Sequence, residues 1–335
     1  MSEEKFIMLA HGNGGRYMRE LIEELFARHL ANPLLDTRVD AAHIPLGAGE
    51  VMVTTDGFTV QPLEFPGGTI GSLAVHGTVN DLAVSGAVPH YLTLSAFIEE
   101  GFEIAQLERI VISLAHAARE ANVAVVAGDT KVVPRGEGGG LYLATTGVGL
   151  RAAGVQLGMQ HIRAGDALLV SGPVGDHGIA VMLAREQFGL RGELLSDAAS
   201  VLPLTQALLK LTGLRFMRDP TRGGLATVAH EIAHATELTV RLHEPHIPVR
   251  DPVRAVCEIL GYDPMFLACE GRVVAVVEAA QAEAALAAWR TLPGGEQAAL
   301  IGHVELGDAQ VVLETELGGQ RLLEELEDEP LPRIC

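Results

Sequence analysis

The chain has little cysteine and little lysine. The few cysteines exclude certain classes of protein, and the few lysines make each one near a motif informative. Three cysteines in 335 residues, at positions 257, 269 and 335, cannot form the disulfide framework of a small secreted protein, and no CxxC pair is present for zinc. Only Lys5, Lys131 and Lys210 are lysines among the 24 basic residues, so a lysine beside a motif is worth particular attention. The formal net charge of −19 disfavours binding to nucleic acid or to an anionic membrane surface.

A targeting segment and a membrane span are also missing from the sequence. The first apolar run, residues 6–10, stops at His11 and is too short for the hydrophobic region of a signal peptide. Residues 67–98 carry a single charged residue, Asp81, but five glycines and Pro89 interrupt them, which is not typical of a membrane helix. We therefore expect a soluble cytoplasmic protein with no membrane partner.

Length and hydrophobic patterning predict a folded α+β protein of two domains. Apolar residues make up 48% of the chain and charged residues 20%, which excludes a disordered chain. Apolar periodicity predicts helices at 17–30, 104–118, 178–187, 225–235 and 281–292, and strands at 51–55, 123–127, 141–149, 167–171, 272–278, 301–304 and 311–315. Helices and strands mix without strict alternation, which favours the α+β class. We place the domains at 1–152 and 153–323.

The last twelve residues, 324–335, differ from the rest of the chain. Five acidic side chains fall within 324–329, and two prolines follow before the terminal cysteine. Repulsion between the acids and the two prolines argue against a packed element, so the sequence predicts a mobile tail.

Two familiar signatures are present, and neither is the favoured interpretation. Residues 230–234 match the HExxH helix of zinc enzymes, but no third ligand is evident beyond a distant acid such as Glu258. An ordinary helix with partly buried histidines explains the segment as well. Residues 147–152 match GxGxxA after a strand, but no helix pattern follows them, so dinucleotide binding is not favoured. No Gly-Lys pair occurs, which excludes a Walker A loop.

Three glycine-rich loops each precede a predicted helix, where free backbone N–H groups can bind phosphate. Such loops are common, so each alone is a weak signal. The candidate phosphate-binding residues, together with Thr55 at the end of the first predicted strand, are Gly12, Asn13, Gly14, Gly15, Gly175, Asp176, Asp219, Thr221, Arg222 and Gly223.

Three aspartates end apolar segments that we interpret as strands, beside Gly, Thr or Asn. They are Asp56, Asp81, which follows Asn80, and Asp129. Magnesium prefers such oxygen ligands and often links carboxylates to substrate phosphates. Turn formation or helix capping is the alternative role for each. Asp81 is the hardest to explain in that way, because it is the only charge in a 32-residue apolar region.

Taken together, these segments resemble the hydrogenase-maturation carbamoyl dehydratases, the HypE family, within the aminoimidazole-ribonucleotide-synthetase superfamily. The matching segments run essentially end to end: 11–15, 54–58, 77–87, 127–133, 171–178, 218–225, 270–272 and 332–335. The terminal cysteine separates this family from the selenophosphate synthetases, which carry a reactive residue near the N-terminus. Asn13 is a small departure, since alanine is common there.

The resemblance implies a two-domain PurM-like fold that binds ATP and Mg2+. The N-terminal half would form a β-barrel across a homodimer, and the C-terminal half would be α/β. The implied reaction is ATP-dependent dehydration of an S-carbamoyl group on Cys335 to an S-thiocyanate, which supplies the cyanide ligands of nickel–iron hydrogenase. The implied partners are the carbamoyltransferase HypF and the iron–cyanide scaffold proteins HypC and HypD.

The resemblance also implies roles for single residues. Asp56, Asn80, Asp81 and Asp129 would bind magnesium, Lys131 would lie near the phosphate or the developing oxyanion, and Glu270 would act as the base. For Lys131 and Glu270, a surface or salt-bridge role is the alternative. Two alternatives remain: a superfamily kinase or synthetase of a small molecule, in which the tail is incidental, and a zinc hydrolase at residues 230–234.

Overall fold

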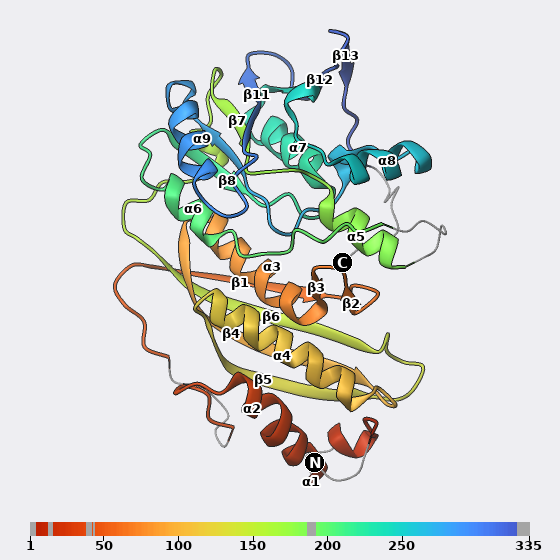
Figure 1. Ribbon diagram of the computed structural model, residues 1–335. Coiled ribbons are helices and arrows are strands. Elements are labelled where there is room, and N and C mark those ends of the chain that lie inside the picture. The colour runs from red at the N-terminus through yellow and green to blue at the C-terminus, as the bar shows by residue number, and fades with distance from the viewer. Residues whose placement is uncertain (1–4, 13–15, 38–41, 43, 186–191, 327–335) are drawn as a thin grey trace. The chain divides into compact units, whose positions relative to one another are not determined.

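The structure is a computed structural model, and it describes residues 5–12, 16–37, 42, 44–185 and 192–326 (Figure 1). These residues form two compact units. The first comprises 5–82 and 87–152, and the second comprises 83–86 and 153–326. Asn13, Gly14, Gly15 and Cys335 lie outside the described residues.

The first unit is built on a four-stranded sheet in the order β1-β6-β4-β5. Its strands are β1 (Glu50–Phe58), β4 (Ala87–Glu99), β5 (Ala124–Val133) and β6 (Leu141–Arg151). The β4/β5 pair is parallel, and the pairs β1/β6 and β4/β6 are antiparallel. A short hairpin of β2 (Glu64–Phe65) and β3 (Gly68–Thr69) precedes α3. Within this sheet, therefore, β1 and β5 are the two edge strands.

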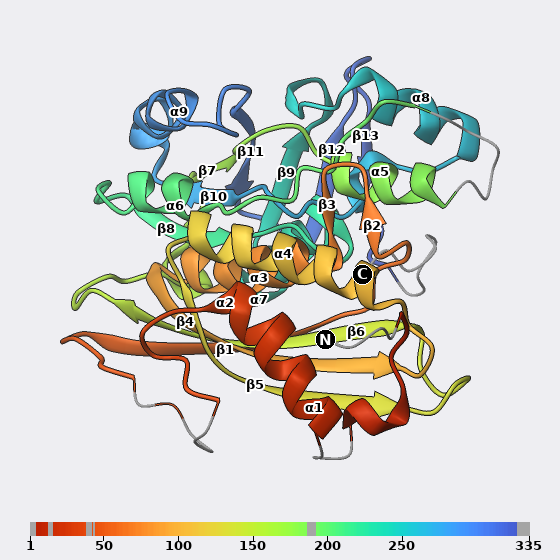
Figure 2. The same ribbon diagram turned by 60° about the horizontal axis from the view of Figure 1, so that its bottom comes forward.

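Helices cover one face of this sheet, as Figure 2 shows for α3 (Ile70–Val84) and α4 (Ile104–Glu120). The apolar stripe of α4, including Leu107, Ile110 and Leu114, is buried, as its periodicity predicts. The first glycine segment begins within η1 (Leu9–Gly12), and a helical run follows it: α1 (Arg16–Leu21), the π-helical η2 (Ile22–Ala27) and α2 (Arg28–Leu30).

The second unit contains a seven-stranded sheet in the order β13-β12-β9-β11-β7-β10-β8. Its strands are β7 (Ala167–Val170), β8 (Leu214–Arg218), β9 (Thr239–His243), β10 (Val274–Val277), β11 (Ala299–Glu305), β12 (Gln310–Glu314) and β13 (Gln320–Leu322). Only the β12/β9 pair among these strands is parallel. The remaining elements are the 3-10 turns η3 (Met159–His161), η4 (Glu244–His246), η5 (Pro264–Phe266) and η6 (Ala279–Gln281) and the helices α5 (Asp176–Ala184), α6 (Leu202–Leu208), α7 (Gly224–Thr236), α8 (Asp251–Leu260) and α9 (Ala282–Arg290).

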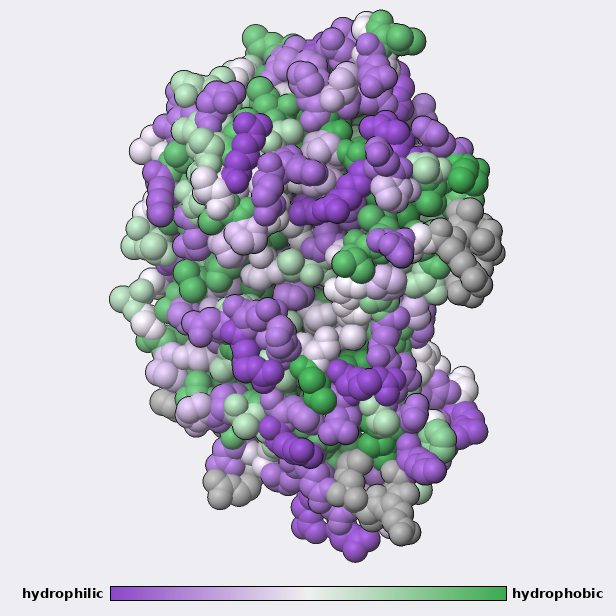
Figure 3. Space-filling view, in the orientation of Figure 1, coloured by the Kyte–Doolittle hydropathy of each residue, from purple (hydrophilic) through white to green (hydrophobic). Residues whose placement is uncertain are grey.

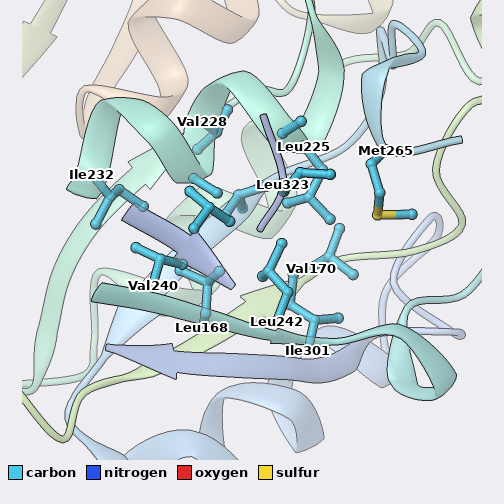
Figure 4. Packing of buried hydrophobic residues seen from close by; sticks show 14 of the residues in the cluster. Leu168, Val170, Leu225, Val228, Ile232, Val240, Leu242, Met265, Ile301 and Leu323 are labelled. Carbon is cyan, nitrogen blue, oxygen red and sulfur yellow. The ribbon is translucent and has the colours of Figure 1, made fainter. Parts of the chain in front are cut away.

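Both faces of this second sheet are buried by helices. In β7, Leu168 and Val170 belong to the core cluster that contains α7, while Ala167 and Leu169 belong to the cluster that contains α6 and α9. This alternation follows the two-residue period of a strand. Figure 4 shows the α7 cluster, in which Val228 and Ile232 lie over Val240 and Leu168.

The α+β class predicted from the sequence is confirmed, but two local predictions are wrong. Asp81 does not end a strand: it lies in α3, a helix with apolar residues on every side and therefore no periodic stripe. Asp56 and Asp129 lie inside β1 and β5 rather than at their ends, because the pairing with β6 and β4 continues through both residues.

Among the described residues, none of the helices is both long enough and apolar enough to cross a bilayer. On the face drawn in Figure 3, hydrophilic side chains surround separate small patches of hydrophobic ones.

Candidate functional site

The first group of candidate residues lies where β1 faces α3. The hydroxyl of Thr54 donates a hydrogen bond to Oδ2 of Asp81 over 2.8 Å. A Cβ atom on Gly77 would lie 3.7 Å from Oδ2 of Asp56. Because Gly77 and Asp81 are one turn apart on α3, both carboxylates lie against the same turn of this helix. Asn80 is next to them in α3 and is buried.

Thr55 lies beside this group and is held by the neighbouring strand. Its hydroxyl donates to the carbonyl of Thr145 over 3.1 Å and accepts from the hydroxyl of Thr146 over 3.2 Å. The structure therefore brings Asp56, Asn80 and Asp81 together at the β1 edge of the sheet, whereas the Thr55 side chain points to the other face, because side chains alternate along a strand. Half-exposed carboxylates with nearby oxygen donors suit a magnesium ion, which prefers oxygen ligands.

The second group lies on the opposite edge strand, β5. Asp129 and Lys131 are two residues apart, so both side chains point to the same face, and both are exposed. Their charged atoms, Nζ of Lys131 and Oδ2 of Asp129, are 3.6 Å apart. Gly12 packs against the same strand, since a Cβ atom there would lie 2.8 Å from Cβ of Val132. Two motifs separated by more than 100 residues thus meet at this edge.

A cavity of ≈ 190 Å³ adjoins the β5 group. Apolar side chains from the helical run 16–30, among them Ile22 and Phe26, form one wall, and residues 125–130 form another. Thr37 and Asp129 supply polar groups. Small ligands commonly bind in such apolar pockets with a few polar groups.

The β1 and β5 groups lie in almost the same row of the sheet, but they are three strands apart and their side chains point to opposite faces. Asp56 pairs with Thr145, Thr145 with Leu94, and the residue after Leu94 pairs with Asp129. At 4.7–4.9 Å per strand, this separation is about 14 Å along the sheet. Asp129 therefore does not join Asp56 and Asp81 around a single ion within one chain.

A buried charge network organises the second unit. Arg272, only 6% exposed, has its guanidinium 3.4 Å from Oδ2 of Asp176 and 3.3 Å from Oδ2 of Asp197. Arg250 also reaches Asp176, with Nε 3.0 Å from the same oxygen. The backbone N–H of Glu270 donates to Oδ1 of Asp197 over 3.1 Å, and Glu270 itself is 4% exposed. The candidate base is thus built into this network.

Burial shifts the pKa values of two groups here. Burial, with the nearby charge of Asp197, raises the pKa of Asp176 to about 6, although Arg250 and Arg272 act in the opposite direction. Burial lowers the pKa of His177 to about 4, and its Nδ1 lies 2.8 Å from the hydroxyl of Ser196.

The loop 172–178 does not offer the free N–H groups that its sequence predicts. The N–H of Gly175 donates to Sγ of Cys269, and that of Gly178 to the carbonyl of Ala268. The loop is buried because residues 267–272 pack directly on it. For Gly175 and Asp176 the structure therefore shows a clamped loop rather than an open phosphate cradle.

The loop 219–224 is only partly exposed, and the N–H groups of Thr221 and Gly224 donate to carbonyls within the loop. Asp219 is buried, whereas Arg222 is exposed. The loop turns into α7 through Gly223, which has a φ of 70°. The N–H of Cys269 donates to the carbonyl of Pro220, which ties this loop to the Arg272 network. The structure thus brings Asp219, Thr221, Arg222 and Gly223 close to the segment that carries Glu270.

Three residues in these groups were not identified from the sequence. Asp197 and Arg250 have no motif around them, and Thr54 belongs to a predicted strand and to the matching segment 54–58 without a role of its own. Asp197 and Arg250 are identified only by their contacts in the structure, because their partners are distant in sequence. Asp197 is 75 residues from Arg272, and Arg250 is 74 residues from Asp176.

Comparison with known proteins covers nearly the whole chain. Residues 38–151 match the N-terminal domain of AIR synthase related proteins, and residues 163–313 match their C-terminal domain. Carbamoyl dehydratase HypE of Azotobacter vinelandii is 48% identical over 98% of this chain and 97% of its own length.

Solved structures agree with this similarity. The crystal structure of hydrogenase maturation protein HypE in complex with ATP has a TM-score of 0.93 and 45% identity, covering 98% of this chain and 99% of that one. A crystal structure of a HypE–HypF complex has a TM-score of 0.81 and 42% identity, covering 91% of this chain and 99% of that one.

Proposed function

Because the chain belongs to the HypE family of carbamoyl dehydratases, we propose that it uses ATP to convert an S-carbamoyl group on Cys335 into an S-thiocyanate. The observation that carries this proposal is the full-length similarity, which extends over 98% of the chain. The chain also ends in the cysteine that would accept the group.

The chemistry requires a better leaving group than hydroxide. The carbamoyl oxygen attacks the γ-phosphorus of ATP while one of the two N–H protons is lost to a base, so that ADP leaves and the product is an imidate phosphate ester. A base then removes the remaining N–H proton, the C–O bond breaks, and phosphate departs as the C≡N bond forms. The sum is S-carbamoyl plus ATP giving S-cyano, ADP and phosphate. Positioning and charge neutralisation dominate such phosphoryl transfers.

For the nucleotide, we assign the cavity beside Asp129 to the purine base and the two carboxylate groups to the metal-bound phosphates. Asp56 and Asp81, with Asn80 beside them, have the oxygen donors that Mg2+ prefers. When bound, Mg2+ would neutralise charge on the phosphates. Thr54 orients the Asp81 carboxylate through its hydrogen bond.

A homodimer would shorten the distance along the sheet between Asp129 and the Asp56–Asp81 pair. If the β1 edge of one copy lies beside the β5 edge of its partner, the two four-stranded sheets close into a barrel and both edges are satisfied. Exposed apolar side chains on β1, Val51 at 51% and Val53 at 63%, fit such a contact. We propose that each nucleotide site then takes Asp56 and Asp81 from one chain and Asp129 from the other.

Lys131 and Glu270 are our candidates for the two remaining roles. Lys131 is one of three lysines in the chain, and its ammonium group beside Asp129 can stabilise negative charge on the transferring phosphoryl group. Glu270 would take the nitrogen proton, and the N–H contact to Asp197 fixes its backbone.

The last described residues show where the acceptor segment starts. The Leu326 side chain lies next to Gly223, since a Cβ atom there would be 3.4 Å from Cδ1 of Leu326. Nine residues, 327–335, follow. At 3.3–3.6 Å per residue they span at most about 30 Å, which sets the radius within which Cys335 can act.

Partners follow from the family. The solved HypE–HypF complex supports HypF as the partner that delivers the carbamoyl group. We propose HypC and HypD as the acceptors of the cyano group and the cytoplasm as the site of action.

Removing the last four residues, 332–335, separates this function from that of a small-molecule kinase or synthetase. We expect the shortened chain to bind ATP as the full chain does but to form no ADP in response to the carbamoyl donor system. Measurement of nucleotide affinity and of ADP release tests both statements. Unchanged ADP formation by the shortened chain would favour the kinase or synthetase.

A further inference from the structure

The HExxH segment, residues 230–234, is not used by the proposed function. It lies within α7, as predicted for an ordinary helix, with His230 buried and His234 exposed. The two histidines are one turn apart, and their ring centroids are 6.1 Å from each other. The distant acid considered from the sequence, Glu258, lies in α8 and does not join them.

The end of the chain supplies the third group instead. After β13, Leu323 is buried in the α7 core cluster, and Oε2 of Glu325 lies 3.1 Å from Nε2 of His234. One ligand atom from each of His230, His234 and Glu325 lies within 4.8 Å of the other two. Throughout the part of the chain that the structure describes, no other three such groups are this close.

His230 adds an independent observation. Its side chain is 7% exposed, and its Nε2 atom is buried without a hydrogen-bond partner among the described residues. A buried polar atom without a partner is unfavourable, and ligation of a metal ion would satisfy it.

We propose that His230, His234 and Glu325 form a site for a borderline divalent transition metal such as Zn2+, and that the ion fastens the start of the C-terminal tail to α7. Two imidazoles and one carboxylate suit this class of ion rather than Mg2+ or Ca2+. With metal–ligand bonds of 2.0–2.2 Å, tetrahedral ligand atoms are about 3.4 Å apart. The His234–Glu325 pair, at 3.1 Å, is close to this spacing, and each of the other two pairs lies within 4.8 Å.

The site anchors the tail rather than catalysing hydrolysis. In a zinc hydrolase the acid of the HExxH motif is the base, but here Oε1 of Glu231 is 3.3 Å from the guanidinium of Arg218 and is held in that ion pair. Glu325, by contrast, precedes Leu326, which lies against Gly223. Metal binding would therefore fix the point from which residues 327–335 depart.

Titration of the full-length, chelator-treated protein with Zn2+ by calorimetry, and with Co2+ by absorption spectroscopy, tests the site. We expect one equivalent to bind. His234→Ala and Glu325→Gln should each weaken binding by more than about 100-fold, the upper end of what loss of an outer-shell partner costs. His303→Ala is the matched control, because His303 also pairs with a glutamate, Glu305, at 3.4 Å.

Three results would overturn the proposal: no stoichiometric binding by the wild-type chain, binding that His234→Ala leaves unchanged, or binding lost in His303→Ala. Binding that Glu325→Gln leaves unchanged would contradict the anchoring of the tail. Circular dichroism of every variant shows whether its fold is intact, and retention of the wild-type spectrum is expected because both substituted side chains are exposed.

Discussion

At the scale of single residues, Arg272 connects several candidate segments of the second unit. Its guanidinium lies beside Asp176 and Asp197, and it also donates hydrogen bonds to the carbonyls of Pro173 and Gly294. Motif similarity indicated Arg272 and Asp176 from the sequence, but Asp197 could not be found that way. A buried carboxylate whose partner is 75 residues away leaves no local pattern.

The raised pKa of Asp176 leads to a prediction about stability. Its carboxyl binds a proton more tightly in the folded chain, with a pKa of about 6, than in the unfolded chain. Between about pH 4 and pH 6 the folded state therefore holds more protons, so this group's contribution to stability falls as pH rises and is lowest above pH 6. The full difference corresponds to at most about 3 kcal/mol.

Asp176→Asn should remove this dependence. Urea denaturation of the nucleotide-free wild type and variant across pH 4–7 measures it: the wild-type free energy of unfolding should fall relative to that of the variant as pH rises to 6. Parallel curves would mean that Asp176 is ionised in the folded protein throughout this range.

At the scale of elements, hydrophobic period decides which helices the sequence predicts. The apolar stripe of α4 and the glycines before α7 can be recognised in the sequence, and both helices form close to where they are predicted. The helix α3 cannot be predicted from the sequence for two reasons. It is buried on all sides and so has no periodic apolar stripe, and its residues Val75, Thr78 and Val79 favour strands by propensity. The sequence pattern consequently predicts a strand at Asp81. The proposed binding of magnesium by Asp81 and Asp56 does not depend on that prediction.

The turn into α7 gives a prediction with a matched control. Gly224 has a φ of 61°, and a Cβ atom there would lie 2.6 Å from the carbonyl oxygens of both Met265 and Leu267. Gly261, at the end of α8, has a φ of 72° but nothing within 4 Å of its Cβ position. Gly261→Ala should cost only the left-handed backbone energy, about 1–2 kcal/mol. Gly224→Ala should cost about 1–3 kcal/mol more, because the carbonyls must move.

Free energies of unfolding from urea denaturation decide this comparison. Equal losses for the two variants would show that the segment 265–267 does not press on the start of α7, and the packing described for the 219–224 loop would be wrong.

At the scale of the whole molecule, the four-stranded sheet has two edge strands, β1 and β5, that no further strand of the sheet pairs with on their outer side. Its edge strands carry the two halves of the proposed metal–nucleotide site about 14 Å apart. Sequence motifs indicated all four metal-binding candidates but could not show that Asp129 lies on the far edge from Asp56, because strand order is a property of the folded sheet.

Mixed dimers test whether two chains share each site. Asp56→Asn and Asp129→Asn should each abolish donor-dependent ADP formation. A doubly tagged, purified heterodimer contains one chain of each variant. One of its two sites then takes the unchanged Asp56 of one chain and the unchanged Asp129 of the other, so about half of the wild-type activity should return. Failure to regain activity in an intact heterodimer would place each complete site within one chain.

The most direct test of the proposed function is the mass of the peptide that contains Cys335. After incubation with the carbamoyl donor system, and then with ATP, the account predicts first a carbamoylated peptide and then its conversion to a form about 18 Da lighter, as loss of water requires, with Cys335→Ala showing neither change. Cys257 and Cys269 are buried and serve as internal controls that stay unmodified. A peptide that remains unmodified in the intact protein, or a carbamoyl group that ATP does not alter, would contradict the central claim.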